Sequence, residues 1–334
     1  MSTVFFGEVM LRLTPSKPQE QLIVAGPLSV DFAGAESNVA SSLCRFGHRT
    51  EYVTKFPAHA LGDAAMASLQ KYGIGTSHIL RGGERMGIYF IELGASIRPS
   101  RVIYDRAYSS ISEITDNEFD WQSILAGQEW LFLGGITPAL SEQCALESIK
   151  AARAAREMGV KVAFDLNFRR SLWQDASKAR EYFSAIMHLA DLVFANAGGL
   201  ADVYEHSFDL NDPLDEAVNV GLFLHETFNV DAAITGRIHH SASKNTVMGT
   251  FLVDGKVSTS LPIEVDILDR LGTGDCFAAG ILHGILKGWN ADRTVDFANA
   301  AFALGHTFFG DQNWLNEREV EAAASGHQSG HIIR

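Results

Sequence analysis

Short hydrophobic runs alternate with longer amphipathic stretches from about residue 128 onward. The runs are residues 130–133, 160–165, 192–195 and 232–235. Short runs that are apolar throughout are typical of strands buried on both faces of a sheet. Residues 141–158 carry alanines and isoleucine at helical spacing and end before Gly159. Repetition of this strand and helix unit predicts an α/β fold with a mainly parallel sheet and helices on its faces.

The first third of the chain has a different pattern. Strand-like pieces are separated here by turn residues rather than by helices, at 22–30, 87–93 and 101–104. Residues 38–46 and 61–72 have helical spacing and lie between these pieces. We therefore expect a small second sheet, built from two insertions into the main fold.

The domain organisation follows from these patterns. We expect one domain over residues 1–324, with a small-sheet lid formed by strands within about 10–32 and 85–106. The last segment, 325–334, is small and polar and is predicted to be a C-terminal tail.

Composition narrows the class of protein. The chain has 334 residues, of which 46% are hydrophobic and 20% charged, as in a folded globular protein. Its net charge of −13 disfavours nucleic acid and anionic membranes as partners. The three cysteines lack CxxC spacing, and the sequence shows neither a signal peptide nor a long apolar span. We expect a cytoplasmic protein.

The most informative run is DRLGTGDCFAAG, residues 269–280. Gly272 and Gly274 allow backbone N–H groups to approach a ligand, and the amphipathic segment that follows predicts a helix. The N–H groups at a helix start favour an anion such as phosphate. Asp275 in the first turn could accept the proton of an attacking hydroxyl. The alternative is that Asp275 only caps the helix and the glycines only form a turn.

This run, with Thr273 at the usual alanine position, resembles the second signature of the ribokinase-like (PfkB) family of sugar kinases. The family's first signature resembles residues 33–40, AGAESNVA. The resemblance covers essentially the whole chain. It implies a three-layer α/β/α fold, a small β-sheet lid, catalysis by Asp275 with Gly272 and Gly274, and the use of ATP and Mg²⁺.

Three further segments look like the 2-keto-3-deoxygluconate kinases within this family. They are RVIYDRAYSS (101–110), LFLGGITPALS (131–141) and DLNFRRSLW (165–173). The implied activity is ATP-dependent phosphorylation of 2-keto-3-deoxygluconate at its terminal hydroxyl, which gives 2-keto-3-deoxy-6-phosphogluconate. The implied sugar-side residues are Gly34, Ala35, Asn38, Tyr89, Tyr104, Arg106, Arg169 and Asp311.

The arginines and tyrosines among these residues are the ones that bear on which substrate binds. Arg106 and Arg169 could neutralise the carboxylate of a sugar acid in bidentate fashion. The alternative for each arginine is a solvated residue or half of an ion pair. Tyr89 and Tyr104 could offer hydroxyls to the sugar, or could pack only against each other across two strands.

The nucleotide side departs from the family pattern. The implied nucleotide-side residues are Asn167, Arg169, Thr235, Gly236, Arg237, Gly272, Thr273, Gly274 and Asn299. Where relatives carry N-x-x-E, this chain reads Asn196-Ala-Gly-Gly199. We therefore expect Mg²⁺ dependence without a named protein ligand, because Mg²⁺ can be held mainly by phosphates and water.

Other functions remain open from the sequence. A kinase of a neutral sugar, fructose or ribose, would share both signatures. A sugar or nucleotide sensor without activity is conceivable because the glutamate is missing, and a Rossmann oxidoreductase is a more distant alternative. The expected partners are small molecules and a second copy of the chain, since exposed lid strands often pair between subunits.

Overall fold

The computed structural model describes residues 2–208 and 211–326. Its main sheet runs in the order β13-β12-β11-β10-β9-β8-β1-β4-β5, and β14 also pairs with β12. From β5 to β11 neighbouring strands are parallel, whereas β12 is antiparallel to its partners. The strands are β1 (Ser2–Phe6), β4 (Arg49–Phe56), β5 (Gly75–Arg81), β8 (Trp130–Gly134), β9 (Lys161–Asp165), β10 (Leu192–Ala195), β11 (Asp231–Ser241), β12 (Lys244–Val253), β13 (Lys256–Thr259) and β14 (Ile263–Asp266).

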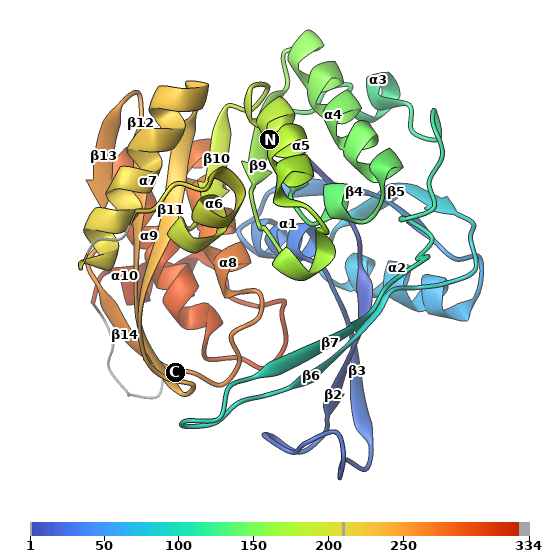
Figure 1. Ribbon diagram of the computed structural model, residues 1–334, viewed down its shortest axis with the longest axis horizontal. Helices are drawn as coiled ribbons and strands as arrows, with labels where there is room; N and C mark the ends of the chain where they lie inside the picture. The colour runs from blue at the N-terminus through green and yellow to red at the C-terminus, as the bar shows by residue number, and fades with distance from the viewer. Residues whose placement is uncertain (1, 209–210, 327–334) are drawn as a thin grey trace.

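Helices cover both faces of this sheet (Figure 1). In β1, Val4 and Phe6 contribute to one hydrophobic core and Phe5 to the other, so a continuous apolar strand is buried on both sides. One core is covered by α3 (Trp121–Ile124), α4 (Glu142–Glu157), α5 (Ala176–Met187), α6 (Ala197–Tyr204) and α7 (Pro213–Phe228). The other is covered by α1 (Ala35–Arg45), α2 (Ala60–Lys71), α8 (Thr273–Lys287), α9 (Ala291–Gly305) and α10 (Glu317–Ala324). The predicted three-layer α/β/α fold is confirmed.

A separate four-stranded sheet projects from this body (Figure 1). Its order is β3-β2-β6-β7, from strands β2 (Met10–Pro15), β3 (Leu28–Ala33), β6 (Ile88–Glu92) and β7 (Arg101–Asp105). The start of the strand predicted at 22–30 was wrong, because the corresponding strand, β3, begins at Leu28. Residues 21–25 form turns, and Ile23 and Val24 are 88% and 69% exposed, so their hydrophobicity does not reflect burial in a sheet.

The tip of the small sheet reaches the main sheet. The Ser96 N–H donates to Ser243 Oγ at 2.8 Å, and the Ala242 N–H donates to the Ser96 carbonyl at 2.7 Å. The connection between β6 and β7 therefore contacts the turn between β11 and β12. These hydrogen bonds join the small sheet to the main sheet. Its role as a lid stays a prediction.

Two expectations lie at the limits of the described structure. The tail predicted at 325–334 falls mostly on residues 327–334, which are outside the described residues. Among the described helices, none combines the length and the apolar character that crossing a membrane requires.

Candidate active site

The anion loop, residues 269–275, leads from the end of β14 into α8. Gly272 has φ +73°, and a Cβ there would lie 1.9 Å from the Asp311 carbonyl oxygen, so both conformation and space require glycine. Helix α8 begins at Thr273, and its first-turn N–H groups have no acceptor within the helix. A Cβ at Gly274 would meet nothing within 4 Å. The backbone at this helix start is therefore open to an anion, as the sequence predicted.

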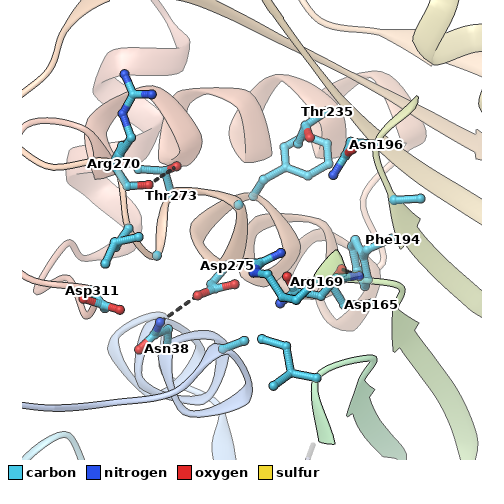
Figure 2. Close-up of a pocket in the computed structure, with 18 of the residues that line it drawn as sticks. Asn38, Asp165, Arg169, Phe194, Asn196, Thr235, Arg270, Thr273, Asp275 and Asp311 are labelled. Carbon is cyan, nitrogen blue, oxygen red and sulfur yellow. Dashed lines mark hydrogen bonds between the residues drawn. The ribbon is translucent and has the colours of Figure 1, made fainter. Parts of the chain in front are cut away.

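Asp275 lies in the first turn of α8 and faces a cavity of about 660 Å³. Its side chain is otherwise enclosed, and Asn38 Nδ2 donates to its Oδ2 at 2.7 Å (Figure 2). Burial raises the pKa of Asp275 well above its usual range. The Asn38 hydrogen bond lowers that pKa, and the nearby carboxylates of Asp165 and Asp311 raise it further. A carboxylate with a raised pKa is suited to take a proton from a hydroxyl.

The start of α1 forms the wall next to Asp275. Gly34 is the N-cap residue, and a Cβ there would lie 2.0 Å from the Glu8 carbonyl oxygen. Gly34, Ala35 and Asn38 line the cavity. Asn38 sits one turn into the helix and does not begin it, so its amide is free to reach Asp275 rather than cap α1.

Arg106 follows β7 and is both an ion-pair partner and a cavity residue. Its Nε donates to Glu8 Oε2 at 2.9 Å, and Nη2 contacts the same oxygen. The guanidinium carbon lies 5.4 Å from the ring centroid of Tyr104. Since Arg106 is 8% exposed, Glu8 balances its charge in a buried place, and the guanidinium still lines the cavity.

Arg169 lies in the exposed segment after β9 and lines the same cavity. Figure 2 shows Arg169 and Asp165 beside Asp275. Burial raises the pKa of Asp165 to about 6, while the charge of Arg169 lowers it. Arg169 thus adds positive charge to a part of the cavity that is otherwise acidic.

Tyr89 and Tyr104 pack near each other and also line the cavity, while their contact with a sugar stays a prediction. They are register partners on β6 and β7, with ring centroids 6.2 Å apart. Both also line the cavity. Tyr89 is buried, and its hydroxyl donates to Asp311 Oδ2 at 2.8 Å. Asp311, predicted on the sugar side, therefore fixes the direction of the Tyr89 hydroxyl.

Strand β11 and the end of β9 also contribute to the cavity wall. Arg237 on β11 lies over the Phe302 ring at 4.7 Å, and its Nη2 donates to Thr273 Oγ1 at 3.1 Å. Burial and the charge of Arg270 lower the Arg237 pKa to about 10. Arg237 and seven other predicted nucleotide-side residues line the cavity: Asn167, Arg169, Thr235, Gly236, Gly272, Thr273 and Gly274.

Asn299 is the predicted residue that the structure does not bring to this cavity. It is buried on α9, and its Nδ2 donates to the carbonyls of Val247 at 3.4 Å and Leu261 at 2.8 Å. Asn299 is buried because α9 packs its Asn299 side against β12. A contact between Asn299 and a nucleotide stays a prediction.

The segment Asn196–Gly199, where the chain departs from the family pattern, forms the start of α6. Asn196 caps α6, and its Oδ1 accepts the Gly199 N–H at 2.9 Å. In residues 2–208 and 211–326, no three His, Cys, Asp or Glu side chains come together as a metal site.

Four charged residues of the site carry no role in the sequence analysis. Glu8 pairs with Arg106, Asp165 faces the cavity, and Arg12 on β2 pairs with Asp269 and Asp311. Glu36 is buried in the first turn of α1. Glu36 lies within the motif at 33–40 and Asp165 within the segment 165–173, so membership of these motifs was the available signal in the sequence. No motif marked Arg12 or Glu8.

The stability of this region should depend on pH through Glu36. Its carboxyl fills the space that Gly7 and Gly134 leave open, and Thr137 Oγ1 donates to it at 3.0 Å. Burial raises the Glu36 pKa from 4.5 to about 7. The folded protein therefore holds this proton at a pH where the unfolded chain has released it, and its contribution to stability is lost as pH rises through about 7.

Glu36→Gln should remove this dependence. The free energy of unfolding of the variant minus that of the wild type should rise by about 3 kcal/mol as pH increases from 4.5 to 8. Urea unfolding of both proteins at several pH values measures the difference. A constant difference across that range would mean that Glu36 is ionised in the folded protein.

A helix start open to an anion, next to a buried carboxylate in the same cavity, defines a phosphotransferase that acts on small hydroxyl-bearing molecules. The comparison with known families makes this specific. Residues 2–315 match the model of the pfkB family carbohydrate kinases, and the chain belongs to this family. It is a carbohydrate kinase with the ribokinase-like fold.

Several relatives are similar over nearly the whole chain. A 2-dehydro-3-deoxygalactonokinase of Haloferax volcanii is 31% identical over 98% of this chain and 98% of its own length. A 2-dehydro-3-deoxygluconokinase of Bacillus subtilis is 28% identical over 97% and 95%. The crystal structure of a 2-dehydro-3-deoxygluconokinase from Thermotoga maritima is 38% identical, covers 98% of this chain and 100% of its own, and has a TM-score of 0.94.

Proposed function

We propose that this carbohydrate kinase transfers a phosphoryl group from ATP to the terminal hydroxyl of 2-keto-3-deoxygluconate, giving 2-keto-3-deoxy-6-phosphogluconate. The observation that carries the proposal is that Arg106 and Arg169 line the same cavity as Asp275. A sugar acid has a carboxylate for these guanidinium groups and a hydroxyl for the aspartate. The names of the similar kinases support the same class of substrate.

Asp275 is the catalytic base in this proposal. Asp275 lines the cavity, and Asn38 Nδ2 donates a hydrogen bond to its Oδ2. The carboxylate accepts the proton of the attacking hydroxyl as that oxygen bonds to the γ-phosphorus of ATP, and the bond from that phosphorus to the bridging oxygen breaks and releases ADP. The N–H groups from Gly272 to Asp275 then stabilise the negative charge on the transferred group.

The donor end of the cavity suits a polyphosphate. Arg237 donates a hydrogen bond to Thr273 of the anion loop and so places positive charge beside that loop. Mg²⁺ prefers oxygen ligands and retains several waters, and Asp165 is the cavity carboxylate that would hold it through water. If bound there, the ion would supply positive charge that offsets the charge of the phosphates. Because Gly199 has no side-chain oxygen, the nucleotide phosphates and water would supply most of the ligands of the ion.

The epimer of the substrate is a separate question. The Haloferax volcanii relative is named for the galactonate epimer and the other two for the gluconate epimer. A coupled assay of ADP release with both epimers, fructose and ribose tests the proposal. Faster turnover of fructose or ribose would overturn the sugar-acid assignment, and no ADP release with any acceptor would favour a sensor.

Arg169→Met should separate a sugar acid from a neutral sugar. Because Arg169 is exposed, the variant should fold normally while kcat/KM for the sugar acid falls about 10- to 100-fold. Arg170→Met is the matched control, since Arg170 is exposed, pairs with Asp202 on α6 and does not line the cavity. Equal activity of the two variants would argue against carboxylate recognition by Arg169.

We also propose a homodimer formed through the small sheet in the cytoplasm. Val30 on β3 is 59% exposed and Ile103 on β7 is 47% exposed, and these are the two edge strands of that sheet. Such edges favour pairing with another strand. Light scattering of the purified protein tests the dimer, and a monomeric mass would refute it.

A further inference from the structure

Arg12 is an arginine with almost no contact with solvent. It lies on β2, and its side chain is 1% exposed. The guanidinium pairs with two carboxylates, Asp269 through Nη2 and Asp311 through Nη1, while Nε donates to Thr14 Oγ1 at 3.0 Å. A buried guanidinium is costly unless it is paired, and here its pairing extends to two separate loops.

The first partner, Asp269, shapes the anion loop. Its Oδ1 accepts the N–H groups of Arg270 at 2.7 Å and Leu271 at 3.2 Å. Its Oδ2 accepts the Gly310 N–H at 3.1 Å and contacts Arg12. Arg12 therefore holds the carboxylate that sets the backbone just before Gly272.

The second partner, Asp311, directs a lid residue. One oxygen accepts from Arg12 and the other from the Tyr89 hydroxyl at 2.8 Å. The Asp311 carbonyl is also the atom against which Gly272 packs. Arg12 thus lies where the small sheet, the anion loop and the loop after α9 meet.

The charges agree with this arrangement. Burial by itself would lower the pKa of Arg12, but Asp311 and Asp269 more than offset it and raise that pKa. Burial raises the pKa of Asp311, which the charge of Arg12 lowers. Without Arg12, two buried carboxylates would face each other with no cation between them.

We propose that Arg12 is a positioning residue of the kinase reaction. Through Asp311 it holds the Tyr89 hydroxyl at the sugar end of the cavity, and through Asp269 it holds the anion loop at the phosphoryl end. The acceptor and the transferred group are thereby kept at a fixed separation. This inference rests on the proposed function, because it takes Tyr89 to face the sugar.

The test is a double-mutant cycle of Arg12→Met, Tyr89→Phe and the double variant, measured with the best acceptor of the four-sugar panel. Arg12→Met should lower kcat/KM about 100-fold, as expected for a displacement of reacting groups. Tyr89→Phe alone should lower it about 10-fold. In the Arg12→Met background, Tyr89→Phe should lower it less than 2-fold, because the hydroxyl is no longer oriented.

Arg12→Lys tests the role of Arg12 even if Arg12→Met does not fold. It retains the buried charge but not the fork that reaches two carboxylates, so Tm should stay near the wild type while kcat falls at least 10-fold. Arg293→Met, which breaks the exposed Arg293–Glu321 pair, should leave kcat and KM unchanged.

The outcomes separate the two proposals. Additive losses in the cycle, or an Arg12→Lys variant with wild-type kcat and KM, would overturn the positioning role and make Arg12 a structural residue. Activity on fructose or ribose but on neither sugar acid would overturn the proposed substrate and still leave the cycle readable with that acceptor.

Discussion

Asp275→Asn is expected to lower kcat by about 10²- to 10⁴-fold, the range for removal of a general base. The amide has the size of the carboxylate, and its oxygen can still accept the 2.7 Å hydrogen bond from Asn38. Tm and the KM for ATP should therefore change little. Steady-state kinetics with thermal unfolding of the same preparation measures both quantities.

The pH profile gives a second readout of the same residue. Below its pKa, Asp275 is protonated and cannot accept a proton, so kcat/KM should fall as pH falls through that pKa. Because burial raises the pKa, this fall should begin above pH 4, where an ordinary aspartate titrates. Asp275→Asn should lose this limb of the profile. A variant that keeps full turnover or the same limb would exclude Asp275 as the base.

Gly272→Ala should have the second largest effect. The residue has φ +73°, and a Cβ would lie 1.9 Å from the Asp311 carbonyl oxygen, which belongs to the backbone and cannot turn aside. The conformation alone costs about 1–2 kcal/mol. Relief of the collision must move the anion loop, so kcat should fall about 100-fold or more.

Gly288→Ala is the matched control for Gly272→Ala. Gly288 ends the same helix with φ +69°, and a Cβ there meets nothing within 4 Å. It should lower Tm through backbone strain alone and leave kcat unchanged. If both variants lose stability equally and Gly272→Ala keeps its kcat, the packing of the anion loop against Asp311 is not needed for transfer.

The sequence predicted the parts of the site that are local in the chain. Gly272, Gly274 and Asp275 lie within a few residues, so their geometry follows from one turn and one helix start. The buried strands were equally local, because strands covered on both faces are apolar at every position. Among the sugar-side residues, the resemblance to a known family supplied what spacing alone did not.

Arg12 could not be predicted, for a physical reason. A single arginine on a strand usually points to solvent, and its partners Asp311 and Asp269 are 299 and 257 positions away. The start of β3 was misplaced for the opposite reason, since Ile23 and Val24 are hydrophobic yet exposed. In both cases solvent exposure depended on contacts that are distant in the chain.

The small sheet and α8 differ in how much they contribute to the core. Twelve of the fifteen residues of α8 are buried, whereas four of the five residues of β7 are exposed. Mutations on β7 can therefore accumulate at little cost in stability, while those on α8 are constrained. Evolution can therefore vary β7, including the cavity residue Tyr104, more freely than the helix that carries Asp275.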